Sequence, residues 1–443
     1  MQATLLWSHW QDLLQPCAHA FTTPGFHRFT EWITGLALNV EEHTITQSLV
    51  GLDRTQDWKA LEYFAELGAW DQPVLEKRFA QLLDAAPGTL WHGYRVSALD
   101  DTKVHRNSPN VWGTCTFHEY TARCPNRAST VRAHNWVVTG ALLPVPGQPG
   151  LFLPVAGRLY FRKTQLPAAQ NGPPVAFRTK CELLVEMLRG HAKSCPGKHL
   201  GVFDGGFALR SVVRPLVKPE EAQQPRIDFV TRLRHDAVLH ALPADQRQPH
   251  QRGRTPVWGK RLPPPRQGGR WPGPWREGQA FLYGRTRKVR YKEVVCLWRV
   301  LGHDVPVKAV LAEVEGFKKR FTLVTSATEL CGLQVVEIFC ARFRQEDAFR
   351  DLKQRLGWEE CRAWTRLPIE RTTQAVLATL SALRLLQLQL QGQRGDDWWL
   401  HPPWNPRKQR PSVLDVERLL WQHRQGIQRC LADWLDNGAN PGQ

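Results

Sequence analysis

The sequence lacks any run of apolar residues long enough to cross a membrane, which takes about 18 consecutive apolar residues. Residues 1–15 include Asp12 and no cluster of basic residues, so the pattern of a secretory signal peptide is missing as well. Both absences argue against a membrane protein and against a secreted one. We therefore expect a protein with no membrane partner and a cytoplasmic location.

Several familiar site patterns are also missing. The ten cysteines form no C-x2-C pair, and no set of histidines has the spacing of zinc ligands, so we interpret the cysteines as scattered, reduced, structural thiols. Neither G-x-S-x-G nor H-E-x-x-H occurs, which argues against those hydrolases. Pro196-Gly197-Lys198 is not a phosphate loop, because Ala192 stands where the upstream glycine should be.

Acidic residues are in deficit. The 41 Asp and Glu residues face 59 Lys and Arg residues, which gives a formal net charge of +18. This excess suggests a polyanionic partner, with nucleic acid as the first candidate, and the alternative is a generally basic protein without such a partner. The length of 443 residues with 42% hydrophobic residues predicts two or three domains with packed interiors.

Hydrophobic periodicity predicts helices at the start of the chain. Thr44 and Gln47 have the spacing of a capping box before a short helix, which Gly51 would end. A second helix follows over 58–67 and a third over 73–83. The short helix, the turn and the longer helix resemble a DNA-binding helix-turn-helix, and the alternative is a helical bundle that only packs.

From residue 89 onward, short strands alternate with Gly and Pro turns and one helix over 181–190, which indicates an α/β core. Asp100 and Asp101 come at the end of the first of these strands, and Asp204 directly follows a later one. Segment 243–290 differs, because it holds 12 Lys and Arg residues together with Pro and Trp. It is either a solvated loop or a contact surface for a polyanion.

The stretch 339–353 carries the sharpest local pattern. On a helix with about 100° per residue, Phe339, Arg342, Glu346 and Lys353 fall within an arc of roughly 60°. A carboxylate flanked by two bases on one face can bind a metal ion while the bases hold phosphates. The alternative is an ordinary surface helix with ion pairs between its turns.

The spacing Phe339-x2-Arg342-x3-Glu346-x6-Lys353 resembles the Y-x2-R-x3-E-x6-K signature of the insertion-sequence DDE transposases, with Phe replacing Tyr at position 339. The resemblance extends over scattered motifs between residues 90 and 392. It implies a ribonuclease H-like α/β core that is interrupted by a mainly β insertion. The lost tyrosine hydroxyl is the one departure at the four signature positions.

The same resemblance implies two further acids upstream of Glu346. Asp101 in its Asp-Thr context and Asp204 at a strand end match these positions, and Asp100 is the alternative for the first, because neighbouring strand residues point to opposite faces. Asp101, Asp204 and Glu346 would then be the catalytic residues and the ligands of two divalent ions, Mg²⁺ or Mn²⁺. Asp101 would bridge the two ions, and each of the other acids would anchor one.

The remaining expected contacts are with DNA. Phe321 resembles an aromatic residue that stacks on a flipped base in several family members, although a core phenylalanine is the alternative. The expected DNA-binding residues are Phe321, Phe339, Arg342, Lys353, Arg285, Arg287, Lys288 and Arg290, the first four from the resemblance and the last four from the basic segment.

Together these patterns predict a DNA transposase that cuts transposon ends and joins them to target DNA, acting on double-stranded DNA as a homodimer. The alternatives are a ribonuclease H-like nuclease without strand transfer and a host-adopted DNA-binding protein. The expected parts are a helical, candidate DNA-binding region (1–88), the first part of the core (89–240), the basic insertion (241–328), the helical part of the core with the catalytic Glu (329–392) and a helical tail (393–443).

Overall fold

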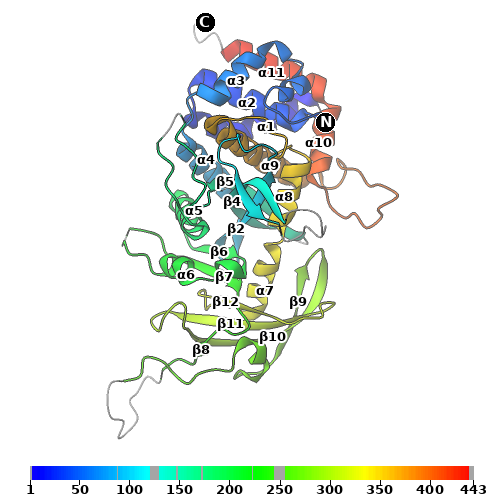
Figure 1. The fold of residues 1–443 in the computed structure, drawn as a ribbon. Coiled ribbons are helices and arrows are strands. Elements are labelled where there is room, and N and C mark those ends of the chain that lie inside the picture. Colours follow the sequence, from blue (N-terminus) through cyan, green and yellow to red (C-terminus); the bar gives the residue numbers. More distant parts are fainter. Residues whose placement is uncertain are drawn as a thin grey trace.

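The computed structural model describes residues 2–86, 88–119, 129–145, 148–170, 173–221, 223–243 and 255–438. The chain forms one large mixed sheet, with a group of helices at one end and further strands at the other (Figure 1). This architecture confirms the expected mixed α/β class. Within the described ranges, no helix is both long enough and apolar enough to cross a membrane. Part of the basic segment, residues 244–254, lies outside the described residues.

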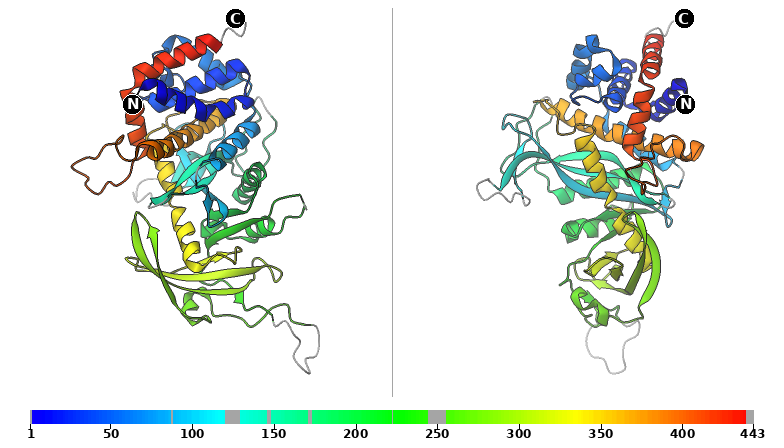
Figure 2. Two further views of the ribbon diagram at one scale, coloured as in Figure 1. Left: turned by 180° about the vertical axis from the view of Figure 1, so that it is seen from behind. Right: turned by 90° about the vertical axis from the view of Figure 1, so that its right-hand side faces the viewer.

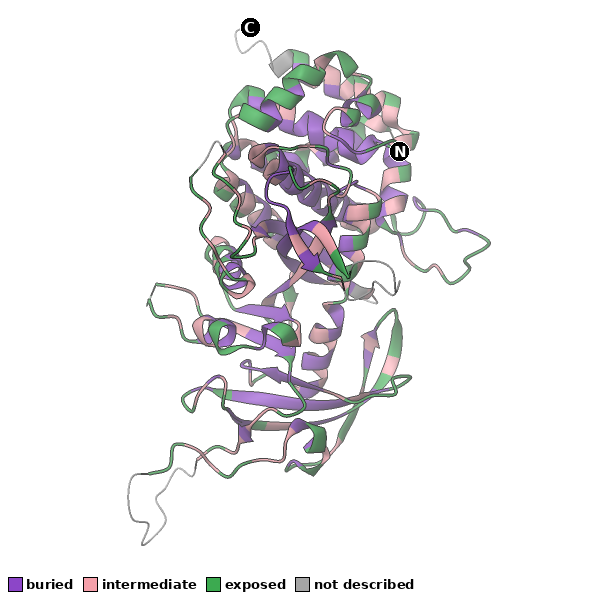
Figure 3. Ribbon diagram, in the orientation of Figure 1, coloured by how far each residue is buried: buried purple, intermediate pink, exposed green. Residues whose placement is uncertain are grey.

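Helices from the two ends of the chain pack together (Figure 1). The central helix of this group lies in the segment that the sequence predicted to be helical, and its neighbours bury most of its length, polar residues included (Figure 3). The helices are α1 (Ala3–Leu14), α2 (Thr23–Leu38), α3 (Trp58–Leu67), α4 (Gln72–Asp84), the central α9 (Arg366–Arg394), α10 (Val413–Gln422) and α11 (Arg424–Gly438), with 3₁₀ helices η1 (Gln15–Ala20), η2 (Gln47–Leu52) and η3 (Thr55–Asp57).

The short helix expected after Thr44 is the 3₁₀ helix η2. The backbone N–H of Gln47 donates to the hydroxyl of Thr44 at 3.2 Å, as the capping pattern predicted. The chain then leaves helical geometry at Asp53, whose φ is 57°. Helix α3 packs against α2 and α9, so this region belongs to the helical bundle.

The centre of the sheet has the strand order β5-β4-β2-β6-β7. Strands β2, β6 and β7 are parallel, and β4 is antiparallel to both β2 and β5. The strands are β1 (Leu90–Trp91), β2 (Tyr94–His105), β3 (Cys115–His118), β4 (Thr130–Val145), β5 (Gln148–Tyr160), β6 (His199–Phe203), β7 (Ile227–Arg232), β8 (Leu239–His240), β9 (Arg276–Leu282), β10 (Arg285–Trp298), β11 (Pro306–Val314) and β12 (Phe321–Thr325).

Two helices connect the parallel strands. Helix α5 (Lys180–Ser194) leads from β5 to β6, and its start is fixed by a capping box between Thr179 and Glu182. Helix α6 (Arg210–Val217) leads from β6 to β7, after the short 3₁₀ helix η4 (Gly205–Phe207). The apolar faces of α5 and α6 pack on the sheet, which holds the ends of β2 and β6 in place.

The strands of the insertion continue the same sheet, in the order β7-β12-β11-β10. Strands β9 and β10 form a hairpin, in which Leu282 pairs with Arg285 and leaves a two-residue turn. Tyr283 and Gly284 in this turn have positive φ values of 52° and 86°, the backbone conformation that such tight hairpins favour. A 3₁₀ helix, η5 (Pro265–Arg270), precedes the hairpin.

The helix expected over 339–353 is divided between α7 (Gly332–Ala341) and α8 (Arg344–Gln354). At the junction the backbone N–H groups of Phe343 and Glu346 donate to residues three positions earlier, Cys340 and Phe343, which tightens the turn. The single continuous face expected for the signature residues is therefore wrong in detail. Figure 2 shows the α7–α8 pair, in yellow, running from the insertion strands toward the helical bundle.

Candidate active site

Two carboxylates lie side by side on adjacent parallel strands. Strands β2 and β6 pair so that Leu99 lies opposite Phe203. An acid follows each of these two residues. Asp100 is the next residue of β2, and Asp204 comes directly after the end of β6. The two groups are close enough that the charge of Asp204 raises the pKa of Asp100.

Asp100 and Asp101 point to opposite faces of the sheet, because successive side chains of a strand alternate. The carboxylate of Asp101 lies on the side of α5, where it pairs with Nζ of Lys180 at 2.6 Å. The carboxylate of Asp100 lies on the side of α7 and α8 and pairs with Arg342 at 2.7 Å. The structure therefore brings Asp100, rather than Asp101, to the face that carries Glu346.

The environment of Asp100 works against its ionisation. Burial raises its pKa from the ordinary 3.8 to about 6, and the charges of Asp101 and Asp204 act in the same direction. The Arg342 guanidinium and the backbone N–H of Asp101 oppose this shift without cancelling it. A desolvated carboxyl group beside a second carboxylate favours a nearby cation, which Arg342 provides here.

Glu346 lies on the same side of the sheet as Asp100, because the start of α8 docks on β4 and Arg342 bridges the two acids. The buried Nε2 of Gln345 donates to the carbonyl of Val138 at 3.1 Å, and Val138 lies directly opposite Asp100 in the β2–β4 ladder. Arg342 lies between the two acids, since its guanidinium is 3.6 Å from Glu346 while it pairs with Asp100. Within the described part of the chain, its buried Nε has no hydrogen-bond partner. A guanidinium in this position can hold an anion.

The other signature residues lie around this centre. The ring of Phe339 is 6.4 Å from that of Phe321 and 5.9 Å from the guanidinium of Arg342, so it links the two. Lys353 lies in the last turn of α8, at the other end of that helix from Glu346. Its Nζ donates to the carbonyl of Lys103 at 2.5 Å and is 3.5 Å from Glu359. The structure therefore brings Phe339 and Arg342 together with Glu346, and it places Lys353 at the far end of β2.

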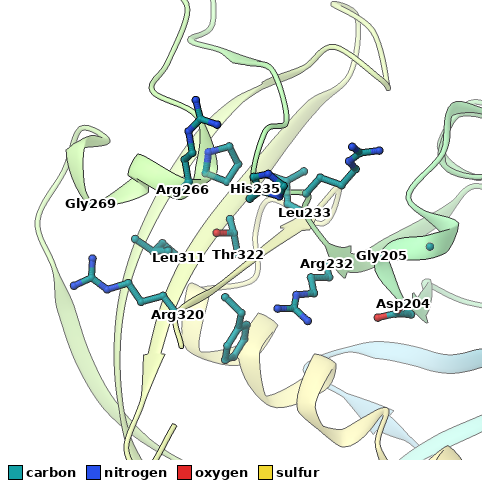
Figure 4. A pocket seen from close by; sticks show the side chains of 14 residues that line it. Asp204, Gly205, Arg232, Leu233, His235, Arg266, Gly269, Leu311, Arg320 and Thr322 are labelled. Atoms are coloured by element: carbon teal, nitrogen blue, oxygen red, sulfur yellow. The ribbon is translucent and has the colours of Figure 1, made fainter. Parts of the chain in front are cut away.

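A hollow of about 520 Å³ opens beside Asp204 (Figure 4). Figure 4 shows the guanidinium groups of Arg232, Arg266 and Arg320 around it, with Asp204 at one side. Phe321 lines the same hollow at the start of β12. An aromatic ring among arginines, next to a carboxylate, suits a nucleotide with its phosphates.

Sequence reasoning missed Tyr283. This residue lies in the turn of the β9–β10 hairpin, and its ring is 5.8 Å from that of Phe343 at the α7–α8 junction. Burial raises the pKa of its hydroxyl, as does the neighbouring thiol of Cys340, and the charges of Arg342 and Glu346 are close enough to affect it. A tyrosine followed by Gly284 between two strands is the signal that could have identified the turn.

The four basic residues expected to contact DNA lie at the start of β10. Arg285, Lys288 and Arg290 are exposed. Arg290 also lies 3.5 Å from Glu313 and stacks over the ring of Trp275. Arg287 is directed inward, where it donates to the carbonyl of Glu315 at 2.7 Å. Three of the four are thus available to a partner, and Arg287 contributes mainly to the hairpin itself.

The residues present are compatible with a divalent cation. The oxygen donors of Asp100 and Asp204 are the type that Mg²⁺ and Mn²⁺ prefer, and a bound cation would offset the cost of ionising the buried Asp100. In the part of the chain that the structure describes, however, no three His, Cys, Asp or Glu side chains gather closely enough to hold a metal ion. Glu346 is held apart from the two aspartates by Arg342.

A mixed sheet that presents paired carboxylates beside a basic hollow is consistent with a nuclease that acts on DNA. A family model described as DDE superfamily endonuclease matches residues 18–299, which is more than half of the chain, so the chain belongs to this family. The match includes Asp100, Asp101 and Asp204 and ends before Arg342 and Glu346. Membership supports a transposase or nuclease role with DNA as substrate, and DDE-type endonucleases generally use divalent metals. No curated protein matches the chain.

Proposed function

We propose that this protein is a DNA transposase that cuts transposon ends and joins the resulting 3′-OH to target DNA. The observation that carries the proposal is the convergence of Asp100 and Asp204, on adjacent strands, with the α7–α8 junction that bears Arg342 and Glu346. Family membership supports the DNA-cleaving class, and the residue spacing around Glu346 supports the insertion-sequence type within it.

We also propose that the core is ribonuclease H-like. Three antiparallel strands followed by two parallel strands, in the order β5-β4-β2-β6-β7 with helices between the later strands, support this assignment. Asp100 in β2 and Asp204 after β6 then lie next to each other, because β2 and β6 are neighbouring strands of this core. The insertion between Asp204 and Glu346 supplies the basic hairpin and the wall of the hollow.

In this proposal the first carboxylate is Asp100, in place of the expected Asp101. Asp100 and Asp204, with Glu346 completing the set, would hold two ions of Mg²⁺ or Mn²⁺. Such ions activate an attacking oxygen and stabilise the leaving oxygen of a phosphodiester. The basis for the choice is that Asp100 lies on the face of the sheet that carries Arg342 and Glu346, whereas Asp101 lies on the opposite face with Lys180.

The other side chains bind and orient the DNA. Arg342 would turn from Asp100 toward the phosphate next to the cut, using the Nε that lacks a partner among the described residues. Phe321 would stack on a base in the hollow, with Phe339 behind it. Water attack at the transposon end breaks the P–O3′ bond and frees a 3′-OH. That hydroxyl then attacks a target phosphodiester: a new P–O3′ bond to the transposon end forms as the target's own P–O3′ bond breaks, and the target 3′ oxygen leaves as a hydroxyl group. Lys353 would contact the DNA further along β2.

An assay of DNA joining tests the proposed function. The purified protein is incubated with Mg²⁺, a target plasmid and a pre-cut duplex that ends in a 3′-OH and is taken from the DNA flanking the coding sequence. A transposase covalently joins the duplex to the plasmid. A nuclease without strand transfer cuts uncut flanking DNA and joins nothing, and a DNA-binding protein protects the flanks without cutting. Because two ends must be joined, we further propose that two copies act together as a homodimer.

Removing the basic residues of β10 is expected to flatten the salt dependence of DNA binding. With Arg285, Arg287, Lys288 and Arg290 changed to Gln, the slope of log Kd against log salt should fall by about two to three, since each lost phosphate contact reduces it by about one. Four residues are changed, but the slope should fall by less than four because Arg287 is directed into the hairpin. Titrations over a range of KCl concentrations measure the slope, and an unchanged slope would remove this surface from the DNA interface.

A further inference from the structure

A second basic cleft lies between the turn of the β9–β10 hairpin and the segment that joins α9 to α10. Its volume is about 510 Å³, and its lining includes the hairpin residues Phe281 and Gly284 together with Trp404, Arg407, Arg410 and Arg418. These residues define what we call the C-terminal cleft. The described residues that line it carry several positive charges and no acidic group. This composition favours an anionic occupant.

Arg410 is the central residue of the C-terminal cleft. It also lines the adjoining hollow, where α8 contributes Arg344 and Arg350 together with the acids Asp347 and Asp351. Burial lowers the pKa of its guanidinium and the neighbouring charge of Arg344 lowers it further, while the charge of Asp347 acts in the opposite direction. Arg410 makes no ion pair or hydrogen bond within the described ranges, and Gly284 of the hairpin turn lies beside its Nη2. A half-buried guanidinium next to another cation is stabilised when an anion binds.

The loop that carries the cleft residues has a fixed base and a projecting tip. Asp415, which is 2% exposed, accepts hydrogen bonds from Nζ of Lys408 at 2.7 Å and from the backbone N–H of Ser412 at 2.8 Å. Between α9 and α10 the loop extends away from the helices (Figure 1). Trp404 in this loop is 78% exposed, more than any other large hydrophobic residue of the described chain. An indole held in solvent beside guanidinium groups is available to a partner.

The C-terminal cleft is linked to the proposed active site by two elements. Arg344 and Glu346 both lie in the first turn of α8 and face opposite sides, toward Arg410 and toward Arg342 respectively. At the hairpin turn, Tyr283 is close to Glu346 while its neighbour Gly284 lines the cleft. A long ligand bound at the carboxylates therefore has a direct route to the cleft past the hairpin turn.

We propose that the C-terminal cleft binds the sugar–phosphate backbone of duplex DNA next to the cleavage site. Arg410, with Arg407 and Arg418, holds phosphates, and Trp404 packs on an adjacent sugar or base. This inference rests on the proposed function, because it takes the DNA at the active site as its starting point. DNA is favoured over an acidic protein because an aromatic ring beside spaced guanidinium groups matches a strand in which phosphates alternate with sugars and bases.

Fluorescence anisotropy tests the cleft with a labelled duplex of arbitrary sequence, full-length protein and EDTA in place of a divalent metal. We expect Trp404→Ala to weaken binding by about tenfold. Arg410→Gln should reduce the salt slope by about one. Arg429→Gln is the matched control, because Arg429 is an exposed arginine of α11 that lines neither cleft nor hollow. Thermal unfolding midpoints verify that all variants fold alike.

Wild-type affinity and slope in both cleft variants would overturn the proposal. Competition by polyglutamate as effective as competition by unlabelled duplex would also overturn it, in favour of an acidic protein partner. The readout involves no cleavage, so the cleft is supported by weakened binding even if the wild-type protein joins no DNA in the assay above. Conversely, if the wild-type protein joins DNA and both variants bind DNA as the wild type does, the proposed transposase function stands and the proposed role of the C-terminal cleft is wrong.

Discussion

Asp100→Asn is expected to abolish metal-dependent DNA cleavage, whereas Asp101→Asn should retain most of it. Loss of a metal ligand removes several kcal/mol of transition-state stabilisation, so the cleavage rate should fall by about 100-fold or more. Asp101 faces α5 and pairs with Lys180, so its substitution costs only a partly exposed ion pair. Single-turnover cleavage of flanking DNA in Mg²⁺ measures both rates.

The two variants are matched, because they make the same chemical change at adjacent positions. Asp204→Asn and Glu346→Gln should behave like Asp100→Asn, since the proposed metal site uses all three carboxylates. Loss of cleavage in Asp101→Asn with activity in Asp100→Asn would reverse the assignment of the first carboxylate. A Glu346→Gln variant that cuts at the wild-type rate would end the proposed mechanism altogether.

Asp351→Ala is expected to lower the free energy of unfolding by about 3–5 kcal/mol, a large share of the total for a domain. Asp351 of α8 pairs with Arg384 of α9 at 3.0 Å, and the side chain of Arg384 is only 5% exposed. Arg384 also donates to the carbonyl of Phe152 in β5. Without Asp351 the guanidinium remains buried with no carboxylate beside it except the more distant Asp347. Denaturant unfolding followed by circular dichroism measures the loss.

Two further variants separate a buried ion pair from a general effect of losing an acid. Asp397→Ala removes an exposed carboxylate without a partner in the described part of the chain and should change stability by less than about 0.5 kcal/mol. The double change Asp351→Leu with Arg384→Met should recover much of the loss, because two apolar side chains replace both charges. If Asp351→Ala costs no more than Asp397→Ala, the pair contributes nothing to anchoring α8.

The sequence predicted much of the core and the region of each acid. Strands β6 and β12 are of the expected kind, because each is a short apolar run between turns. The helix bearing Glu346 was located by its residue spacing. Asp101 was preferred to Asp100 for its Asp-Thr context, but alternation along the strand shows only that the two face opposite sides, not which side α8 covers.

The remaining differences arise from contacts between distant segments. Strand β9 is polar along most of its length, and it forms because β10 lies beside it, so no local pattern indicated it. The break between α7 and α8 occurs within a sequence of good helical periodicity, where Phe343 contacts Tyr283 from the hairpin. Such pairings depend on the tertiary fold rather than on the local sequence.

The core and the insertion share one continuous sheet, so the distance between the end of β6 and strand β10 is fixed. From β6, which precedes Asp204, the path to β10 passes through β7, β12 and β11 by hydrogen-bonded steps. Four steps of about 4.8 Å give about 19 Å, the rise of about five to six base pairs of duplex. DNA bound by β10 would thus be contacted about half a helical turn from the cut. The position of this contact relative to the cut could not change without breaking the hydrogen bonds of the sheet.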